Sequence, residues 1–317
     1  NRVRWFVQRK TRGANNPRLE NFLLHEKYDY VYPALLYDYN GRLNSGAWIA
    51  DFQYHHFPDG AHPEVTREAE KRIGAIARRA RKIIFSSNYC EQDAYELFPE
   101  TKGKSYTMPF TVYIDEEHTK NEGLESILAK YSLPGDYLMV SNLFAPTKNH
   151  KTLFNALGLL AKEGIAINLV CTGNMVDYRN QSYANDILDM ITSNGIRSQV
   201  HLLGLIPRAD QVLLYRKSRA LVQPSVNEGW STLVEEAKAL GKKMLLSDIA
   251  VHREQMPGNP YFFKSLSAED LAGKIKLLYK DTGSQNYPDL KAEEIARTAY
   301  QQKVMAFAQN FLKIAEA

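Results

Sequence analysis

Residues 220–240 read ALVQPSVNEGWSTLVEEAKAL, and this stretch decides the fold. A short apolar run ends at Pro224, which predicts a buried strand over residues 220–223. After a turn through Gly229, apolar residues recur with helical spacing at Leu233, Val234, Ala237 and Leu240. This spacing predicts a helix over about 231–240. A buried strand that turns through a glycine into a helix is the repeating unit of a parallel α/β sheet.

The same alternation runs along the rest of the C-terminal half. Strands are expected over residues 137–143, 165–172, 200–203 and 243–247, and helices around 153–164, 184–192 and 209–217. In the N-terminal half we expect strands over residues 30–36, 47–49, 82–85 and 105–110, a long helix from Pro63, and a short helix over 93–97. One or two helices close the chain over residues 290–317. These patterns predict doubly wound α/β domains, divided at the turn-rich segment 131–136 into residues 1–134 and 135–317.

Composition excludes several classes of protein. The 317 residues suffice for two domains, and 44% hydrophobic with 24% charged residues is ordinary for a globular protein. No apolar run approaches the ~18 residues of a membrane-spanning helix, and residues 1–12 do not resemble a secretory signal. Cys90 and Cys171 fit neither a disulfide framework nor a metal motif, so we expect a reducing, cytoplasmic setting. A net charge of +4 is too small to indicate nucleic acid.

Several familiar catalytic motifs are absent from the sequence. There is no GxGxxG for a dinucleotide, no HExxH, and no Asp-x-Asp pair to hold a metal against a diphosphate. The eight histidines do not fall into a metal-ligand spacing. The sequence therefore predicts neither a metal site nor a cofactor.

The turn within residues 223–236 predicts an anion site. The start of a helix at the carboxyl edge of a parallel sheet offers unpaired N–H groups and the positive end of the helix dipole. The backbone of Gly229, Trp230 and Ser231 is the expected cradle for a phosphate. Glu228, just before the glycine, is expected at the end of the strand, beside that phosphate.

Helical geometry separates two neighbouring glutamates that follow this turn. At ~100° per residue, Glu235 is expected to point away from the apolar stripe, toward water. Glu236 is expected on the same side as Thr232, facing the space above the strand ends. A carboxylate there suits a sugar diol, because it accepts hydrogen bonds from two hydroxyl groups.

Together, Glu228 and Glu236 resemble the Glu-x7-Glu motif of retaining glycosyltransferases with the GT-B fold, in particular family 4. Residues 140–150 are similar to the first strand and helix of that family's donor domain, where a basic pair holds the donor diphosphate. Lys148 stands at the lysine position, whereas Asn142, which can donate a neutral hydrogen bond, stands at the arginine position. The segment around Leu205 is similar to the loop that lies against the nucleobase.

The resemblance extends over about residues 28–315. Residues 247–254 match the family's next strand and turn, where His252 is a candidate to line the donor pocket. Residues 48–58 resemble a bacterial branch in which a histidine matching His56 lies in the interdomain cleft. Packing or capping is the alternative interpretation of His56, since His55 is adjacent. Nothing in residues 1–27 resembles the family's first strand and glycine-rich loop, so either the sequence is truncated or this domain is unusual.

The resemblance implies two Rossmann-like doubly wound domains that face each other across a cleft. It implies retaining, metal-independent transfer of a sugar from a nucleotide-diphosphate donor to a glycan or lipid-linked hydroxyl acceptor, in bacterial cell-surface polysaccharide or glycolipid synthesis. The implied catalytic residues are Lys148, Glu228 and His56. The implied donor-binding residues are Asn142, Leu205, Gly229, Trp230, Ser231, Thr232 and Glu236.

Three questions stay open at this stage. The basic helix over residues 67–82 fits a solvated face, or a surface that attracts anionic lipid headgroups at the inner face of a membrane. Nucleic acid is disfavoured, because no aromatic residues are interleaved among the cations. A sugar-nucleotide epimerase and a non-catalytic nucleotide-binding module remain alternative functions, to be separated from a transferase by product analysis and by a donor-hydrolysis assay.

Overall fold

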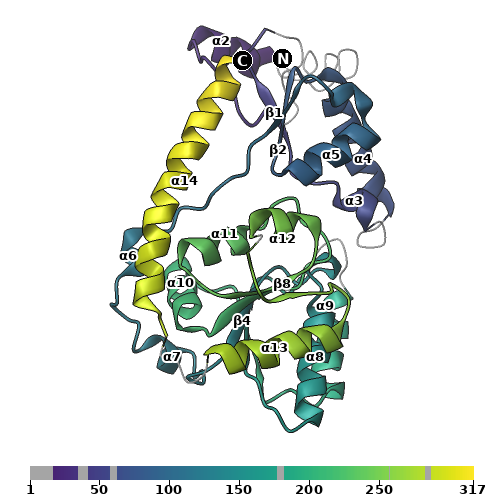
Figure 1. Ribbon diagram of the computed structural model, residues 1–317. Coiled ribbons are helices and arrows are strands. Elements are labelled where there is room, and N and C mark those ends of the chain that lie inside the picture. Colours follow the sequence, from purple (N-terminus) through teal and green to yellow (C-terminus); the bar gives the residue numbers. More distant parts are fainter. Residues whose placement is uncertain (1–16, 35–41, 58–62, 177–181, 257, 283–286) are drawn as a thin grey trace. The chain divides into compact units, whose positions relative to one another are not determined.

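Figure 1 shows the computed structural model of the chain. It describes residues 17–34, 42–57, 63–176, 182–256, 258–282 and 287–317. By their internal contacts these residues form two compact units. The smaller unit lies within Asn1–His56, Pro63–Phe110 and Val304–Ala317, and the larger within Phe57–His62 and Thr111–Lys303.

The larger unit is built on a parallel sheet, with the described strands in the order β6-β5-β4-β7-β8-β9. These strands are β4 (Leu138–Ser141), β5 (Leu169–Thr172), β6 (Val200–Gly204), β7 (Ala220–Gln223), β8 (Met244–Ser247) and β9 (Phe262–Phe263). This is the strand order of a Rossmann fold. The direction in which strands are added reverses between the neighbours β4 and β7, so their carboxyl ends form the switch point where such folds bind ligands.

Helices cover both faces of this sheet because its strands are apolar on both sides (Figure 1). Residues of α8 (His150–Lys162), α9 (Tyr183–Ser193) and α13 (Ala268–Thr282) share one core with Leu138 and Val140 of β4. Residues of α10 (Arg208–Lys217) and α11 (Thr232–Ala239) share a second core with Met139. The unit also contains α6 (Glu116–Thr119), α7 (Ile127–Lys130), η3 (Pro146–Lys148) and α12 (Ala250–Gln255).

The smaller unit contains a parallel sheet in the order β1-β2-β3. Its strands are β1 (Gly46–Ile49), β2 (Lys82–Phe85) and β3 (Ser105–Thr107). Its helices are α2 (Pro17–His25), α3 (Gln53–His56), α4 (Pro63–Arg79), α5 (Asn88–Leu97) and η2 (Pro99–Thr101). The last helix, α14 (Leu290–Glu316), contributes Ile314 to a cluster with Ile84 and Met108. Among the described residues, no helix combines the length and the apolar character needed to cross a membrane.

Most of the predicted elements are confirmed, including the strand over residues 220–223 and the helix from Pro63. The predicted strand over residues 30–36 is wrong where the structure describes it: only Val31 makes a strand-like bridge, to Ser45. Pro33 has no N–H to donate to a regular ladder, and the Ala34 N–H donates to the Gly46 carbonyl (2.8 Å) instead. Residues 35–36 lie outside the described part. The structure adds β9, α12 and α13, which the sequence patterns did not predict.

The sequence-based division follows residue 134, whereas contacts group residues 111–134 with the larger unit. Leu124 and Ile127 account for this grouping, because both are buried in the core that includes Met139. Residues 1–16, on which the prediction of a missing strand and glycine loop partly falls, lie outside the described residues. Cys90 and Cys171 are buried, and no disulfide joins them.

Candidate functional site

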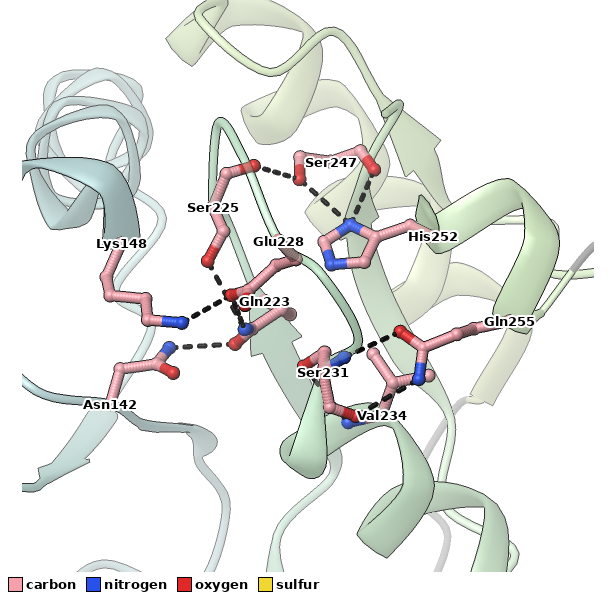
Figure 2. A network of polar contacts seen from close by, with 10 residues as sticks. All are labelled: Asn142, Lys148, Gln223, Ser225, Glu228, Ser231, Val234, Ser247, His252 and Gln255. Carbon is pink, nitrogen blue, oxygen red and sulfur yellow. Dashed lines mark hydrogen bonds and ion pairs between the residues drawn. The ribbon is translucent and has the colours of Figure 1, made fainter. Parts of the chain in front are cut away.

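An ion pair between a partly exposed lysine and a buried glutamate marks the switch point of the larger unit. Lys148 lies in η3, just beyond β4, and Glu228 lies in the turn beyond β7. The Lys148 Nζ and Glu228 Oε1 atoms are 2.5 Å apart. Gln223 Nε2 donates to the same Oε1 (2.8 Å), and Asn142 Nδ2 donates to Gln223 Oε1 (2.7 Å). Figure 2 shows these four side chains converging from the residue after β4, from η3, from β7 and from the turn that follows β7.

The neighbours of Glu228 decide its charge. Burial raises the pKa of the Glu228 carboxyl group, but the Lys148 ammonium and hydrogen bonds lower it by more, so the pKa lies below its usual value. His252 is fully buried, and burial lowers the pKa of its ring. Its Nδ1 lies 2.9 Å from the Ser247 carbonyl, which favours a proton on Nδ1. The pair therefore remains charged beside a neutral imidazole.

The start of α11 is held by Gln255, a residue that the sequence analysis missed. Ser231 Oγ caps the helix by accepting from the Val234 N–H (3.4 Å). The Ser231 N–H donates to Gln255 Oε1 (3.0 Å), and Gln255 Nε2 donates back to the Ser231 carbonyl (3.1 Å; Figure 2). The sequence analysis expects the Ser231 N–H to bind a phosphate, but in this structure that N–H donates to the Gln255 side chain.

The two glutamates of α11 differ from the sequence-based expectation in one respect. Glu236 lies near Arg208, with 2.6 Å between Oε1 and the guanidinium, and burial raises its pKa. Glu235, expected to face water, is instead 3% exposed. It accepts from Lys238 (2.6 Å) and from Gln255 Nε2 (3.2 Å). The periodicity of a single helix does not reveal that α12 packs over this face.

Other predicted donor-binding residues lie around the same helix start. Thr232 is exposed, Trp230 is half-buried, and Gly229 is buried in the turn between them and Glu228. Leu205 follows β6 and is 79% exposed, which leaves its side chain accessible to a planar ligand.

His56 belongs to the smaller unit, at the end of α3. Its Nε2 lies 2.7 Å from Asp93 Oδ2 and 3.3 Å from the Tyr89 hydroxyl. Burial raises the pKa of Asp93 despite the His56 contact. Asp93 lies on α5, 37 residues further along the chain, so no local spacing in the sequence signals this pairing.

The described residues contain no group of three or more His, Cys, Asp or Glu side chains that could hold a metal ion. The charged groups of the larger unit's site are instead two cations, Lys148 and Arg208, each against one carboxylate. Such an arrangement can bind phosphate and sugar hydroxyl groups through charge-assisted hydrogen bonds.

Comparison with known proteins agrees with this fold. Residues 126–300 match the family model of glycosyl transferases group 1. The chain is 24% identical over 238 residues to O-antigen chain mannosyltransferase B of Escherichia coli, covering 74% of this chain and 61% of the relative. A Campylobacter jejuni N,N'-diacetylbacillosaminyl-diphospho-undecaprenol α-1,3-N-acetylgalactosaminyltransferase is 36% identical over 118 residues, 36% of this chain and 30% of the relative.

A solved structure, Anabaena Alr3699/HepE in complex with UDP and glucose, matches 87% of this chain and 72% of its own with a TM-score of 0.67 at 17% identity. The chain therefore belongs to the glycosyl transferases group 1 family. Its fold is of the α/β GT-B class with parallel sheets, as the sequence predicts. The chain spans less than two thirds of the length of both curated relatives.

Proposed function

We propose that this protein transfers a sugar from a nucleotide-diphosphate sugar to a hydroxyl acceptor, with retention of the anomeric configuration and without a metal. The observation that carries the proposal is the Lys148–Glu228 pair at the carboxyl ends of β4 and β7, beside the start of α11. A cation and a helix start at a switch point are suited to a phosphate-bearing ligand.

The barrier to such a transfer lies in breaking the anomeric C–O bond while negative charge builds on the departing diphosphate. Lys148 stabilises that charge where it develops. Glu228 positions the sugar ring, and Glu236 holds the ribose by accepting hydrogen bonds from its hydroxyl groups. Leu205 and the turn at 229–232 complete the donor pocket, with Asn142 as a neutral donor. His56 acts on the acceptor side.

The substrates follow from chemistry and from the relatives. One relative is named for the O-antigen chain and another for a diphospho-undecaprenol-linked sugar, which supports a glycan or lipid-linked acceptor in bacterial surface polysaccharide synthesis. A structural relative holds UDP and glucose, which supports a nucleotide-sugar donor. We place the reaction in the cytoplasm, at the inner face of the membrane, where basic residues of α4 attract anionic lipid.

The test is a nucleotide-sugar screen with calorimetry and a transfer assay. Lys148→Ala is expected to lower kcat/KM by about 100-fold and to weaken binding of the nucleoside diphosphate, because it removes a positioned charge. Glu236→Ala is expected to weaken nucleoside diphosphate binding by about tenfold. Glu228→Ala is expected to spare that binding and impair transfer.

The controls separate this proposal from its alternatives. Activity is expected to survive EDTA, and its loss would reopen metal catalysis. Epimerised donor formed without an acceptor would favour an epimerase. Nucleotide binding with neither transfer nor hydrolysis would favour a non-catalytic module. The opposite order of effects for Glu236→Ala and Glu228→Ala would overturn the two roles assigned here.

A further inference from the structure

We infer that Arg208 is the second cation for the donor's diphosphate, and that it leaves Glu236 when the ribose binds. The inference rests on the proposed function and adds to it a residue that neither the motifs nor the relatives assign. The donor of the proposed reaction carries its ribose next to the diphosphate. A residue that leaves the ribose-binding carboxylate can therefore contact a phosphate without leaving the site.

Arg208 stands at the first turn of α10, immediately after the loop that contains Leu205. Its guanidinium contacts Glu236 (2.6 Å) and donates to Gln211 Oε1 (2.9 Å). Gln211 Nε2 donates to Ser141 Oγ (2.6 Å), at the carboxyl end of β4. Two hydrogen bonds thus connect Arg208 to the strand end that precedes Asn142, at the switch point of the sheet.

The charge balance of the site favours a second cation that can turn toward the diphosphate. Lys148 and Arg208 balance Glu228 and Glu236, so this set of four side chains carries no net charge. A diphosphate brings several negative charges, and charge-assisted hydrogen bonds from cations that turn toward it bind it more strongly than neutral donors do. Lys148 is one such cation. Arg208 is the other, because its side chain is 38% exposed and its planar guanidinium can bind phosphate through two parallel hydrogen bonds.

Replacing Arg208 by ribose hydroxyl groups leaves the Glu236 carboxylate hydrogen-bonded, so the exchange has a small free-energy cost. Its side chain is 9% exposed, so it needs a hydrogen-bond donor in every state. In the structure described here Arg208 and the hydroxyl group of the buried Tyr215 fill that need. With donor bound, the ribose hydroxyl groups replace Arg208 at Glu236, and the released guanidinium pairs with a phosphate. The pairing therefore protects the carboxylate before the nucleotide arrives.

The test compares ligands that differ only in phosphate. Uridine, UMP and UDP, and the corresponding guanosine series, are titrated calorimetrically into the wild-type protein, Arg208→Gln and Arg208→Lys. For the series that the wild type binds, Arg208→Gln is expected to lower diphosphate affinity by about tenfold or more while nucleoside affinity stays equal or rises. Arg208→Lys is expected to restore part of the loss. Arg197→Gln, which removes an exposed cation preceding β6, is the charge-matched control and is expected to change neither affinity.

If Arg208 serves only to hold Glu236 in place, the titrations give a different result. In that case Arg208→Gln lowers nucleoside and diphosphate affinity by the same factor, and the inference is overturned. It is also overturned if diphosphate affinity does not change. Thermal unfolding of each variant shows whether a loss reflects folding. A wild type that binds no nucleotide in the nucleotide-sugar screen would instead contradict the proposed function itself, so the two failures are distinguishable.

Discussion

His150 is fully buried next to the site, and among the described residues neither of its ring nitrogens has a hydrogen-bond partner. Its ring stacks on Phe144, with centroids 4.2 Å apart and planes 7° from parallel. Burial, aided by the Lys148 charge, lowers the pKa of His150 from 6.5 to about 3. The folded protein thus keeps this ring neutral at pH values where the unfolded chain protonates it.

This difference in pKa predicts a pH dependence of stability. Below about pH 6.5 His150 is protonated in the unfolded chain, whereas in the folded protein it stays neutral down to about pH 3. The free energy of unfolding therefore falls as pH falls through that window. Between pH 7 and 5 the expected loss from this residue is about 2 kcal/mol. His150→Leu removes the group, so its urea unfolding free energy should depend less steeply on pH over this range. Parallel curves for the two proteins would contradict the assignment.

The ion pair between Lys148 and the buried Glu228 contributes more to the position of its two charges than to stability. Breaking a buried ion pair by removing one partner costs more than replacing both, because the remaining charge is left without compensation. The pair is therefore a weak source of stability but keeps a cation and a carboxylate in fixed positions at the strand ends. A substrate phosphate that binds Lys148 also changes the electrostatic surroundings of Glu228, which links donor binding to the position of the proposed sugar contact.

At the scale of elements, Asn149 joins the two loops that carry this pair. Its backbone is left-handed (φ 52°, ψ 41°) between η3 and α8. Its Nδ2 donates to the carbonyl groups of Pro224 (3.0 Å) and Ser265 (2.6 Å), and its Oδ1 accepts from Thr152 (2.9 Å). The loop after β4 is thereby fixed to the loop after β7, which sets the distance between Lys148 and Glu228.

Two substitutions at Asn149 separate its contributions. Asn149→Gly keeps the left-handed backbone but loses the side-chain hydrogen bonds, whereas Asn149→Ala loses both advantages. We expect both variants to be destabilised in urea unfolding, with Ala worse than Gly by about 1 kcal/mol because a Cβ is disfavoured in this conformation. Both are also expected to lower kcat, since Lys148 loses its anchor. An Ala variant as stable as the Gly variant would show that the backbone there relaxes.

How far the sequence predicts elements depends on the range of the interactions that form them. The strand over residues 220–223 and the capped helix after it follow from local apolar runs and turn residues, and the structure confirms both. The burial of Glu235 and the site contacts of Arg208 and Gln255 do not follow from the sequence patterns, because elements distant in sequence create the environments of these residues. The two-residue strand β9 is too short to give a periodic signal. Composition and local periodicity carry no information about such contacts.

At the scale of the whole molecule, the predicted donor-binding groups gather in one unit. All seven of them, together with Lys148 and Glu228, lie in Thr111–Lys303, whereas the third predicted catalytic residue, His56, lies in the smaller unit. The described residues of the larger unit include a six-stranded sheet and two buried cores, so the framework of the proposed nucleotide site lies within the larger unit. The smaller unit holds His56, whose Nε2 lies 2.7 Å from Asp93 Oδ2 and which the proposed function assigns to the acceptor side.

The anomeric configuration of the product tests whether the reaction needs only Lys148 at the leaving group or also a base such as His56. In a retaining transfer the acceptor hydroxyl arrives on the face that the diphosphate leaves, and a departing phosphate oxygen takes its proton. No separate base is needed, and Lys148 stabilises the leaving group throughout. An inverting transfer instead needs a base on the opposite face of the sugar, a role for which an imidazole such as His56, hydrogen-bonded to Asp93, is chemically suited.

We expect the new glycosidic bond to have the same anomeric configuration as the donor. NMR of the purified glycoside distinguishes the anomers by the one-bond coupling constant between the anomeric carbon and its proton, whatever the configuration at C2 of the sugar. His56→Gln is the matched variant, since it removes the acid–base function with a small change in size. In the retaining reaction it should lower the rate without abolishing transfer. An inverted product together with complete loss of activity in His56→Gln would assign the proton transfer to the His56–Asp93 pair and contradict the retaining mechanism.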